Sequence, residues 1–531
     1  MHGTLDYLEL PRVNLRFVFR QLGLLMLVLG GSVLIVGLWD LLAWLTGDER
    51  QKFAAIAQLS SAGIIGALGG GLFFFTRGGD DYLGRREALL LVGMSWLIGA
   101  ALAALPFFLW AHLDPAVDPN HPFLRFIDCY FESMSGLTTT GASVLGTTPN
   151  DIESLPPGLL LWRATTHWMG GLGIVVLFVA VLPTLGVGGK KLFNFESTGP
   201  TKSGVKPRIR ETARVLWLIY LGLTAVQTIA LMICGMSLFD AICHTFATLA
   251  TGGFSTRNAS IGDPQFGPAI YIVITVFMLF AGVNFGLYYQ LFRGKTSNVF
   301  RDPELRLYLA MLAIASIILS VNLINMPIHT TGGQYIGSAS VGEAIQHGTF
   351  QAVSIQTTTG FVSADFNHWP FISQATLVTI MFFGGCAGST GGGVKVIRVL
   401  IAFKVLLSSA ERVFRPNAIR PVKIGKMAVD PDVRLDTVVY VLGIIVLSFV
   451  GGVLIMMFED GRPKGDMLTC FTASVATLNN IGPGLHLVGA TENFGDFSGL
   501  SKALMSLLMA LGRIEVYAIF VLFVPRFWRT E

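Results

Sequence analysis

The chain repeats one short pattern four times: TTTGASV (Thr138–Val144), ATGGFST (Ala250–Thr256), TTTGFVS (Thr357–Ser363) and LNNIGPG (Leu478–Gly484). Aligned on one glycine each, these stretches are in register at intervals of 112, 107 and 122 residues, on Gly141, Gly253, Gly360 and Gly482. A fixed period with one Thr/Gly-rich turn per unit predicts a repeat array. Four such turns can meet around one axis, where backbone carbonyl oxygens replace the hydration shell of an ion. The pattern therefore predicts a single-chain, fourfold pseudosymmetric cation pore.

The composition is that of a membrane protein. Of the 531 residues, 52% are hydrophobic and only 13% are charged, against about 25% charged in an average soluble domain. Many apolar runs reach the roughly 18 residues that a membrane span needs, so we predict an all-α polytopic membrane protein. The 61 glycines exceed the usual share of about 7%, and in membrane helices such an excess lets backbones approach closely.

Motifs for organic cofactors are missing from the sequence. The five cysteines are scattered, with no CxxC pair and no histidine at metal-ligand spacing. The chain has no Walker loop, and the glycines around Gly170–Gly173 lie in an apolar span, where a soluble dinucleotide-binding unit cannot form. We therefore expect no organic cofactor. We interpret the basic loops of the chain as markers of its orientation in the membrane and not as a nucleic-acid-binding surface.

Two leading spans, at 14–46 and 53–76, carry no such turn, and four units follow them. Each unit has an outer span, a short pore segment and an inner span. The short segments cannot cross about 30 Å of hydrocarbon, so we predict re-entrant half-helices. The predicted spans are 87–112, 124–138 and 157–187; 213–236, 239–250 and 266–293; 305–326, 341–357 and 371–407; and 434–458, 466–478 and 499–525. The segment limits are 1–84 for the leading helices and 85–195, 196–300, 301–425 and 426–531 for the four units.

Lysine and arginine gather in one set of connections, including 190–210 and 412–426, whereas the connections with the pore segments are poor in them. The positive-inside rule makes the basic side cytoplasmic. It follows that both termini are expected in the cytoplasm and that every pore turn opens toward the outside. The expected location is the cytoplasmic (inner) membrane, within the lipid bilayer.

Each predicted filter turn combines one glycine with the residues before it. Glycine allows backbone dihedrals that a Cβ would obstruct, and the preceding residues are expected to contribute carbonyl oxygens. The half-helices direct their partially negative C-terminal ends at the membrane centre, which favours a cation there. Acidic residues near the helix starts fit helix capping: Asp128, Asp240, Glu343 and Asp466. The predicted filter comprises Thr139, Thr140, Gly141, Thr251, Gly252, Gly253, Thr358, Thr359, Gly360, Asn480, Ile481 and Gly482.

The third inner span is interrupted by six glycines within ten residues: Gly384, Gly385, Gly388, Gly391, Gly392 and Gly393, with Ser389 and Thr390 among them. At about 1 kcal/mol each relative to alanine, they are too costly for a continuous helix. Non-helical backbone at membrane depth is tolerated where it lines a wet cavity, so we expect a mobile loop below the filter. The alternative is a small-residue face for helix packing.

Taken together, these residues resemble the ion-translocating subunit of the Trk/Ktr/HKT potassium transporter superfamily, most closely the bacterial Trk type. The similarity runs from about residue 85 to 525. Glycine at all four register positions implies potassium, because sodium-selective plant relatives have serine in the first. The two extra leading spans also resemble the Trk branch. The motifs that carry the resemblance are WRATTHWMGGLGI (Trp162–Ile174), FESTGPTKSGVKPRIRETA (Phe195–Ala213), GVNFGLYY (Gly282–Tyr289), GGCAGSTGGGVKV (Gly384–Val396) and GRIE (Gly512–Glu515).

The resemblance also implies a gate. In relatives the intramembrane glycine-rich loop closes the pore, and Arg513 would project into the pore beside it. A charge inside an apolar span is costly and usually functional. The alternative for Arg513 is a structural ion pair with Glu132 or another buried acid. Glu515 is expected to find a basic partner elsewhere, and His167 is more often a packing residue than a proton relay.

Two other functions remain open at this point. A symporter moving potassium with protons or sodium would need a titratable relay, and Glu132, His167, Arg513 and Glu515 form no obvious chain. A membrane-embedded enzyme would need converging acid/base groups, whereas the polar residues recur fourfold with glycine. The resemblance further implies a homodimer and a separate cytosolic, nucleotide-binding regulatory subunit of Rossmann type, for which 190–210 and 412–426 are plausible docking surfaces.

Overall fold

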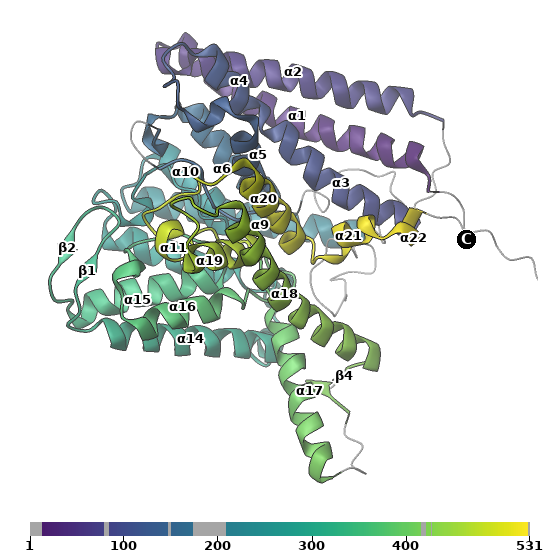
Figure 1. Ribbon diagram of the computed structural model, residues 1–531, viewed down its shortest axis with the longest axis vertical. Coiled ribbons are helices and arrows are strands. Elements are labelled where there is room, and N and C mark those ends of the chain that lie inside the picture. Colours follow the sequence, from purple (N-terminus) through teal and green to yellow (C-terminus); the bar gives the residue numbers. More distant parts are fainter. Residues whose placement is uncertain are drawn as a thin grey trace, which may run out of the picture.

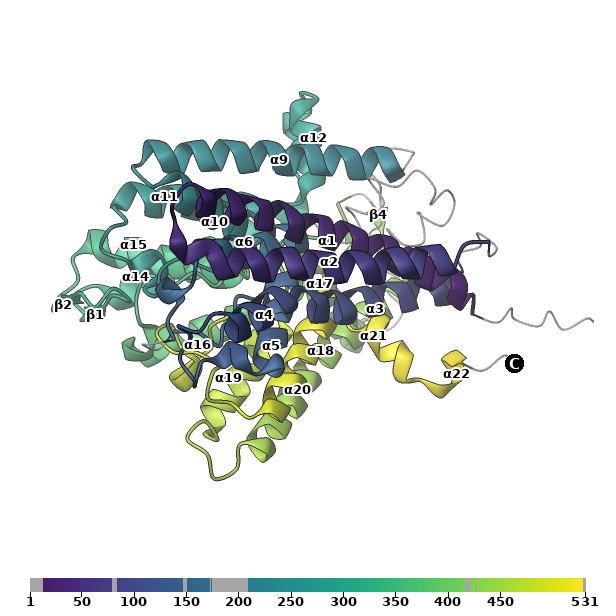
Figure 2. The ribbon, with the colours of Figure 1, turned by 90° about the horizontal axis from the view of Figure 1, so that it is seen from above.

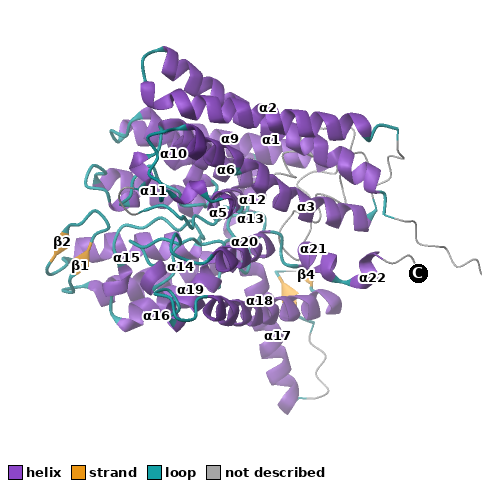
Figure 3. Ribbon diagram, turned by 45° about the horizontal axis from the view of Figure 1, so that its top comes forward, coloured by secondary structure: helices purple, strands orange, loops and turns teal. Residues whose placement is uncertain are grey.

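The computed structural model describes residues 13–78, 84–146, 150–171, 173, 209–415, 421–425 and 427–528. The fold is helical, with two small hairpins of two strands each (Figure 3). In the described part of the chain, six helices are long and apolar enough to cross a membrane, or seven if one bent pair counts as a span. The predicted all-α polytopic fold is confirmed.

The two leading helices form an antiparallel hairpin along one side of the molecule (Figure 1). They are α1 (Leu15–Leu45) and α2 (Lys52–Phe75), joined through a short 3-10 helix. Their backbones meet closely, because a Cβ on Gly23 would lie 2.8 Å from the carbonyl oxygen of Gly69. Small residues at the crossing therefore bring the two helices into close contact.

After α2 the described helices follow one order four times, with a long apolar segment, a short helix and an inner segment. The outer segments are α3 (Arg85–Ala103) with α4 (Leu105–Leu113), α9 (Ile209–Ile233), α14 (Pro303–Leu323) and α18 (Pro431–Phe458). The short helices are α5 (Phe126–Leu137), α10 (Leu238–Leu249), α15 (Val341–Gln356) and α19 (Met467–Leu478). The inner segments contain α6 (Pro157–Gly171); α11 (Pro268–Ala281) and α12 (Phe285–Phe292); α16 (Phe371–Met381) and α17 (Val396–Phe414); and α20 (Gly499–Arg513) with α21 (Tyr517–Phe520).

Polar residues start the short helices, though not always the predicted ones. Asp466 caps α19 by accepting from the N–H of Thr469 at 3.0 Å, and Glu343 forms a capping box with Ser340 at the start of α15. The expected caps at Asp128 and Asp240 are wrong. Asp240 lies in the first turn of α10, whose cap is Ser237. Asp128 is buried beside Lys502 and bonds its ammonium group, and Arg125 is 2.7 Å away.

The second and fourth inner segments are broken where the sequence predicted continuous spans. α11 and α12 meet at an angle of 94° instead of forming one span over 266–293, and α12 stands away from the bundle beyond α9 (Figure 2). The predicted span 499–525 is interrupted after Arg513, where Glu515 and Val516 have positive φ angles of 57° and 65°. The continuation of the first inner span to 187 lies outside the described residues, as does most of the basic segment 190–210.

The remaining elements are peripheral connections. α17 extends away from the bundle in Figure 1, and a hairpin of β3 (Lys423–Ile424) and β4 (Met427–Ala428) follows it. A second hairpin, β1 (Ile328–His329) with β2 (Tyr335–Ile336), precedes α15. Short helices α13 (Thr296–Phe300) and α22 (Pro525–Trp528) complete the set. Part of the predicted docking segment 412–426 also lies outside the described residues, at 416–420 and 426.

Candidate functional site

The four predicted turns share one backbone conformation. In each of them the register glycine has a positive φ, and so does the residue two positions before it. A positive φ is a genuine outlier for a β-branched residue, and three of the four preceding residues are threonines. The φ angles are 54° and 82° for Thr139 and Gly141, 55° and 80° for Thr251 and Gly253, 59° and 79° for Thr358 and Gly360, and 54° and 99° for Asn480 and Gly482.

Each turn is held to the end of its own short helix by the same hydrogen bond. The residue just before the register glycine donates its N–H to a carbonyl five residues earlier, at 2.8 or 2.9 Å. This repeated bond fixes the turn directly after the last helical residue. The four pairs are Thr140 to Ser135, Gly252 to Ala247, Thr359 to Ser354, and Ile481 to Ala476.

The turns touch one another in a closed ring. A Cβ on Gly141 would lie 2.0 Å from the carbonyl oxygen of Gly252 in the second turn. A Cβ on Gly253 would lie 2.1 Å from the carbonyl oxygen of Thr359 in the third turn, and one on Gly360 would lie 1.9 Å from that of Ile481 in the fourth. A Cβ on Gly482 would lie 2.7 Å from the carbonyl oxygen of Thr140, back in the first turn. No Cβ fits at such distances, so both the φ angle and the close approach require glycine.

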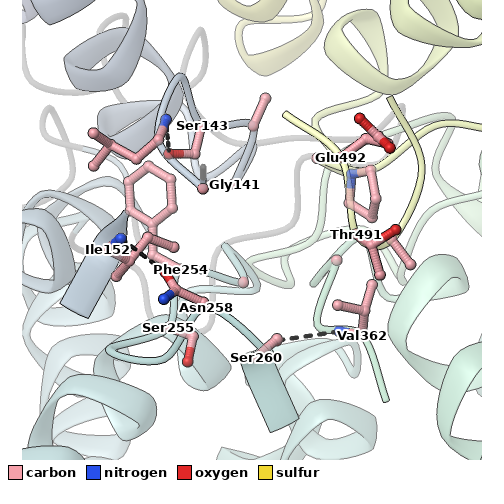
Figure 4. A pocket seen from close by; sticks show the side chains of 18 of the residues that line it. Gly141, Ser143, Ile152, Phe254, Ser255, Asn258, Ser260, Val362, Thr491 and Glu492 are labelled. Atoms are coloured by element: carbon pink, nitrogen blue, oxygen red, sulfur yellow. Dashed lines mark hydrogen bonds between the residues drawn. The ribbon is translucent and has the colours of Figure 1, made fainter. Parts of the chain in front are cut away.

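A cavity opens on one side of the ring (Figure 4). All four register glycines line it, together with the residues that follow them in each turn. Figure 4 shows Gly141, Ser143 and Phe254 on one side and Thr491 and Glu492 across from them. The structure thus brings all four predicted turns to one place, where they line one cavity.

The glycine-rich segment lies between α16 and α17 and is not helical, as the sequence predicted. Among its contacts are residues that precede the register glycines, and none of its own residues lines the cavity. The N–H of Gly392 donates to Oγ1 of Thr358 at 2.6 Å, and a Cβ on Gly392 would lie 2.6 Å from the carbonyl oxygen of Asn479. The segment therefore packs directly against the third and fourth turns.

Glu304, at the start of α14, anchors this segment. Its Oε1 accepts from the N–H of Ala387 at 2.7 Å and from the N–H of Ile397 at 3.1 Å. The carboxylate is buried, and it bonds one residue inside the glycine-rich stretch and one in the first turn of α17. Glu304 was not predicted as a site residue, because nothing in its local spacing points to a segment more than 80 residues away.

Arg513 connects the glycine-rich segment with the first unit. Its Nη1 donates to the carbonyl of Thr390 at 2.7 Å, and its Nη2 donates to the carbonyls of Gly170 and Gly171 at the end of α6, the latter at 2.7 Å. Glu132, the suggested structural partner, instead pairs with Arg163 at 2.8 Å. Arg513 therefore bonds backbone carbonyls from two other units.

Further charged side chains surround the glycine-rich segment. Glu515 pairs with Arg398 at 2.5 Å, as expected of an acid that needs a distant basic partner. Lys395 is buried and donates to the carbonyl of Gly391. The sequence analysis did not single out Lys395 or Arg398, since both belong to the apolar-looking stretch that begins α17.

The arrangement of turns, cavity and segment can now be compared with known proteins. The family model TrkH, described as a cation transport protein, matches residues 90–530. The chain belongs to the TrkH family. TrkH membership confirms the resemblance drawn from the motifs, and it makes the chain a membrane transport protein and not an enzyme.

Named TrkH-family relatives match nearly the whole chain. The Trk system potassium uptake protein TrkH of Escherichia coli (strain K12) is 38% identical over 519 residues, covering 97% of this chain and 100% of the relative. The Trk system potassium uptake protein TrkG of the same organism is 35% identical over 474 residues, covering 87% and 90%. The crystal structure of the potassium transporter TrkH from Vibrio parahaemolyticus is 32% identical, with a TM-score of 0.78 and coverage of 97% and 100%.

Proposed function

We propose that this protein takes up potassium across the cytoplasmic membrane through a gated pore whose selectivity filter is the ring of four turns. The observation that carries the proposal is the closure of the ring, in which each turn meets the next and the fourth meets the first. Relatives that match over nearly their full length are named potassium uptake proteins. The proposed filter residues are those predicted from the repeats, from Thr139–Gly141 to Asn480–Gly482.

Backbone strain at equivalent positions supports a functional role for the turns. A residue in a sparsely populated φ/ψ region costs about 1–3 kcal/mol and persists only where the surrounding structure imposes it. Thr139, Thr251 and Thr358 bear this strain at the same register. Such a conformation, repeated around one ring, supports backbone carbonyls held ready for a dehydrated cation.

The glycine-rich segment is the proposed gate. It packs against the third and fourth turns, and Thr390 within it is bonded to Arg513. Non-helical backbone at this depth fits a segment that lines a water-filled passage. A guanidinium held beside that passage repels a cation. Together the segment and Arg513 would obstruct potassium until the gate moves.

Regulation and orientation complete the proposal. The basic connections would face the cytoplasm together with both termini, so that the cavity faces outward. The relatives belong by name to a Trk system, which supports a further component. That component would be a separate cytosolic nucleotide-binding subunit docking on 190–210 and 412–426 of a homodimer.

A potassium symporter driven by protons or sodium is the second candidate. Two of the acids that a proton relay would use are occupied by ion pairs, Glu132 with Arg163 and Glu515 with Arg398. His167 stacks on Phe254 with ring centroids 4.1 Å apart. These local contacts favour conduction without a coupled proton.

Ion flux from the purified protein in liposomes tests the proposal. A potassium gradient should drive flux that exceeds the flux of sodium under the same gradient. The reversal potential should follow the potassium gradient and stay unchanged when a pH or sodium gradient is imposed. A shift with the pH or sodium gradient would establish the symporter, and an absence of potassium flux would refute the proposed function.

A further inference from the structure

Every turn of the ring is braced by a polar side chain from its own short helix. In the first three units the brace occupies one register, nine residues before the glycine, and in the fourth it is one residue earlier. The braces differ in chemistry between units: a carboxylate, an imidazole, an amide and a hydroxyl. Glu132 Oε2 accepts from the N–H of Val144 (3.0 Å), His244 Nε2 contacts Ser255 Oγ (3.0 Å), Gln351 Oε1 accepts from the N–H of Ser363 (3.3 Å) and Thr472 Oγ1 accepts from the N–H of Leu485 (3.1 Å).

The brace of the first unit belongs to a buried ion pair. Arg163, on α6, places Nη2 2.8 Å and Nε 2.9 Å from Oε1 of Glu132. Ser143 Oγ donates to both carboxylate oxygens, at 2.9 and 3.1 Å. The side chain of Glu132 is fully buried and that of Arg163 is 1% exposed. The carboxylate is therefore tied to the first turn and to the guanidinium at once.

The same guanidinium reaches the second turn. Its Nη1 donates to the carbonyl of Ser255 at 3.3 Å, and its central carbon lies 4.0 Å from the centre of the Phe254 ring. Phe254 directly follows the register glycine Gly253. Figure 4 shows Phe254 beside Ser143 at the wall of the cavity. Arg163 thus bonds Glu132, the brace of the first turn, and also contacts the Ser255 carbonyl and the Phe254 side chain of the second turn.

We propose that Glu132 and Arg163 form a strut that sets the spacing between the first and second turns, and thereby the selectivity of the ring for potassium over sodium. This inference rests on the proposed function of the ring as a filter. The planar guanidinium suits the role, since its fixed fork can bond a carboxylate and a carbonyl while stacking on an aromatic ring. Both residues are positioning residues, because they act on the ion through the backbone of the turns.

Arg163→Lys tests the strut. The ammonium group keeps the charge beside Glu132, but as a compact point charge it cannot also reach Ser255 and cover the Phe254 ring. We expect the ratio of potassium to sodium flux to fall by about fivefold or more, in keeping with the loss of charge-assisted bonds. The matched control is Arg434→Lys on α18, where the arginine Nε donates to the carbonyl of Val429. That control should keep the wild-type ratio.

The flux ratio separates this role from a purely structural one. A loss of folded protein lowers both fluxes together and leaves their ratio unchanged, whereas an altered ring changes the ratio itself. Glu132→Gln is the second variant, because it retains one oxygen for the N–H of Val144 while it removes the charge that pairs with Arg163 and one of the two acceptors for Ser143. It should lower the ratio in the same direction, whether or not Arg163→Lys yields folded protein.

The results distinguish failure of the strut from failure of the filter. Wild-type liposomes without potassium selectivity would refute the proposed function itself. Selective wild-type protein, together with an unchanged ratio in the folded variants, would overturn the strut and leave the filter standing.

Discussion

The guanidinium of Arg513 is joined to the backbone carbonyl of Thr390 by a hydrogen bond of 2.7 Å, which fastens the end of α20 to the glycine-rich segment. A second bond of 2.7 Å joins the same side chain to Gly171 at the end of α6. One arginine therefore connects the first, third and fourth units at the level below the ring. Its removal should release the segment from two neighbours at once.

Arg513→Ala is expected to raise potassium flux per folded molecule. At an effective dielectric constant near 20, a unit charge about 6 Å from a passing cation repels it by about 3 kcal/mol. Arg513→Lys should retain most of the obstruction because the charge remains. Flux in liposomes, normalised to the amount of folded protein, measures both variants. Equal or lower flux from folded Arg513→Ala would show that the arginine is structural.

Gly141→Ser should lower the selectivity for potassium over sodium. The added Cβ would stand 2.0 Å from the carbonyl oxygen of Gly252, so the ring must open, at a cost of about 1–3 kcal/mol in stability. Gly63→Ser is the control, because beyond the adjoining residues and backbone of its own helix nothing lies within 4 Å of a Cβ at that position. Permeability ratios in liposomes report the effect. Equal ratios for the two variants would remove Gly141 from the filter.

Deleting Gly391, Gly392 and Gly393 should raise the basal flux of the protein without any partner. The shortened segment can no longer reach Thr358, to which Gly392 now donates. The measurement is potassium flux per folded molecule in liposomes made from the purified chain alone. Wild-type flux from a folded deletion variant would make the segment a packing element.

Glu304→Ala should also raise the basal potassium flux, though by less than the deletion. It removes the acceptor for the N–H groups of Ala387 and Ile397 without shortening the segment. Asp302→Ala is the matched control. Asp302 caps the same helix by accepting from the N–H of Leu305, and Leu305 does not belong to the glycine-rich segment. If both variants raise flux equally, loosening of α14 is the cause and not release of the segment.

Asp466→Ala should lower the stability of the protein by about 1 kcal/mol, the usual effect of losing a helix cap. The N–H of Thr469 would lose its acceptor at the start of α19. Thermal unfolding in detergent measures the change. Asp460→Ala, at an exposed position before the same helix, should leave the unfolding temperature as it is. Identical curves for the two variants would contradict a stabilising cap.

The short helices could be predicted closely from the sequence because their ends are set locally. The prediction 466–478 differs from α19 (Met467–Leu478) by one residue, since Asp466 caps one end and the Asn/Gly-rich turn with Gly482 follows the other. The glycines of the third inner segment predicted its break, but the breaks in the second and fourth inner segments could not be predicted in the same way. Hydropathy stays high on both sides of the bend after Ala281, whereas the bend itself depends on distant contacts. One of these is the bond from the N–H of Phe285 to the carbonyl of Gly388.

The site divides along the same line. Repetition revealed the four glycines and the threonines before them, because an equivalent position recurs in each unit. Glu304 and Arg163, the partner of Glu132, occur once each. A contact between distant segments produces no recurring spacing in a single sequence by which it could be predicted. The hydrogen bonds from Arg513 to carbonyls of α6 also join distant segments, so they could not be predicted from the sequence either.

The contact between the last turn and the first has a consequence for biosynthesis. Nδ2 of Asn480 donates to Oγ1 of Thr140 at 3.0 Å, between residues 340 positions apart. Because chains fold from the N-terminal end as the ribosome extends them, the first three turns are synthesised before the fourth. Until the fourth turn is present, they can form only an open arc. A chain that stops before Gly482 lacks the fourth turn, so the first and third turns are left without the neighbour that closes the ring. The ring can therefore close only after the last of its four turns has been synthesised.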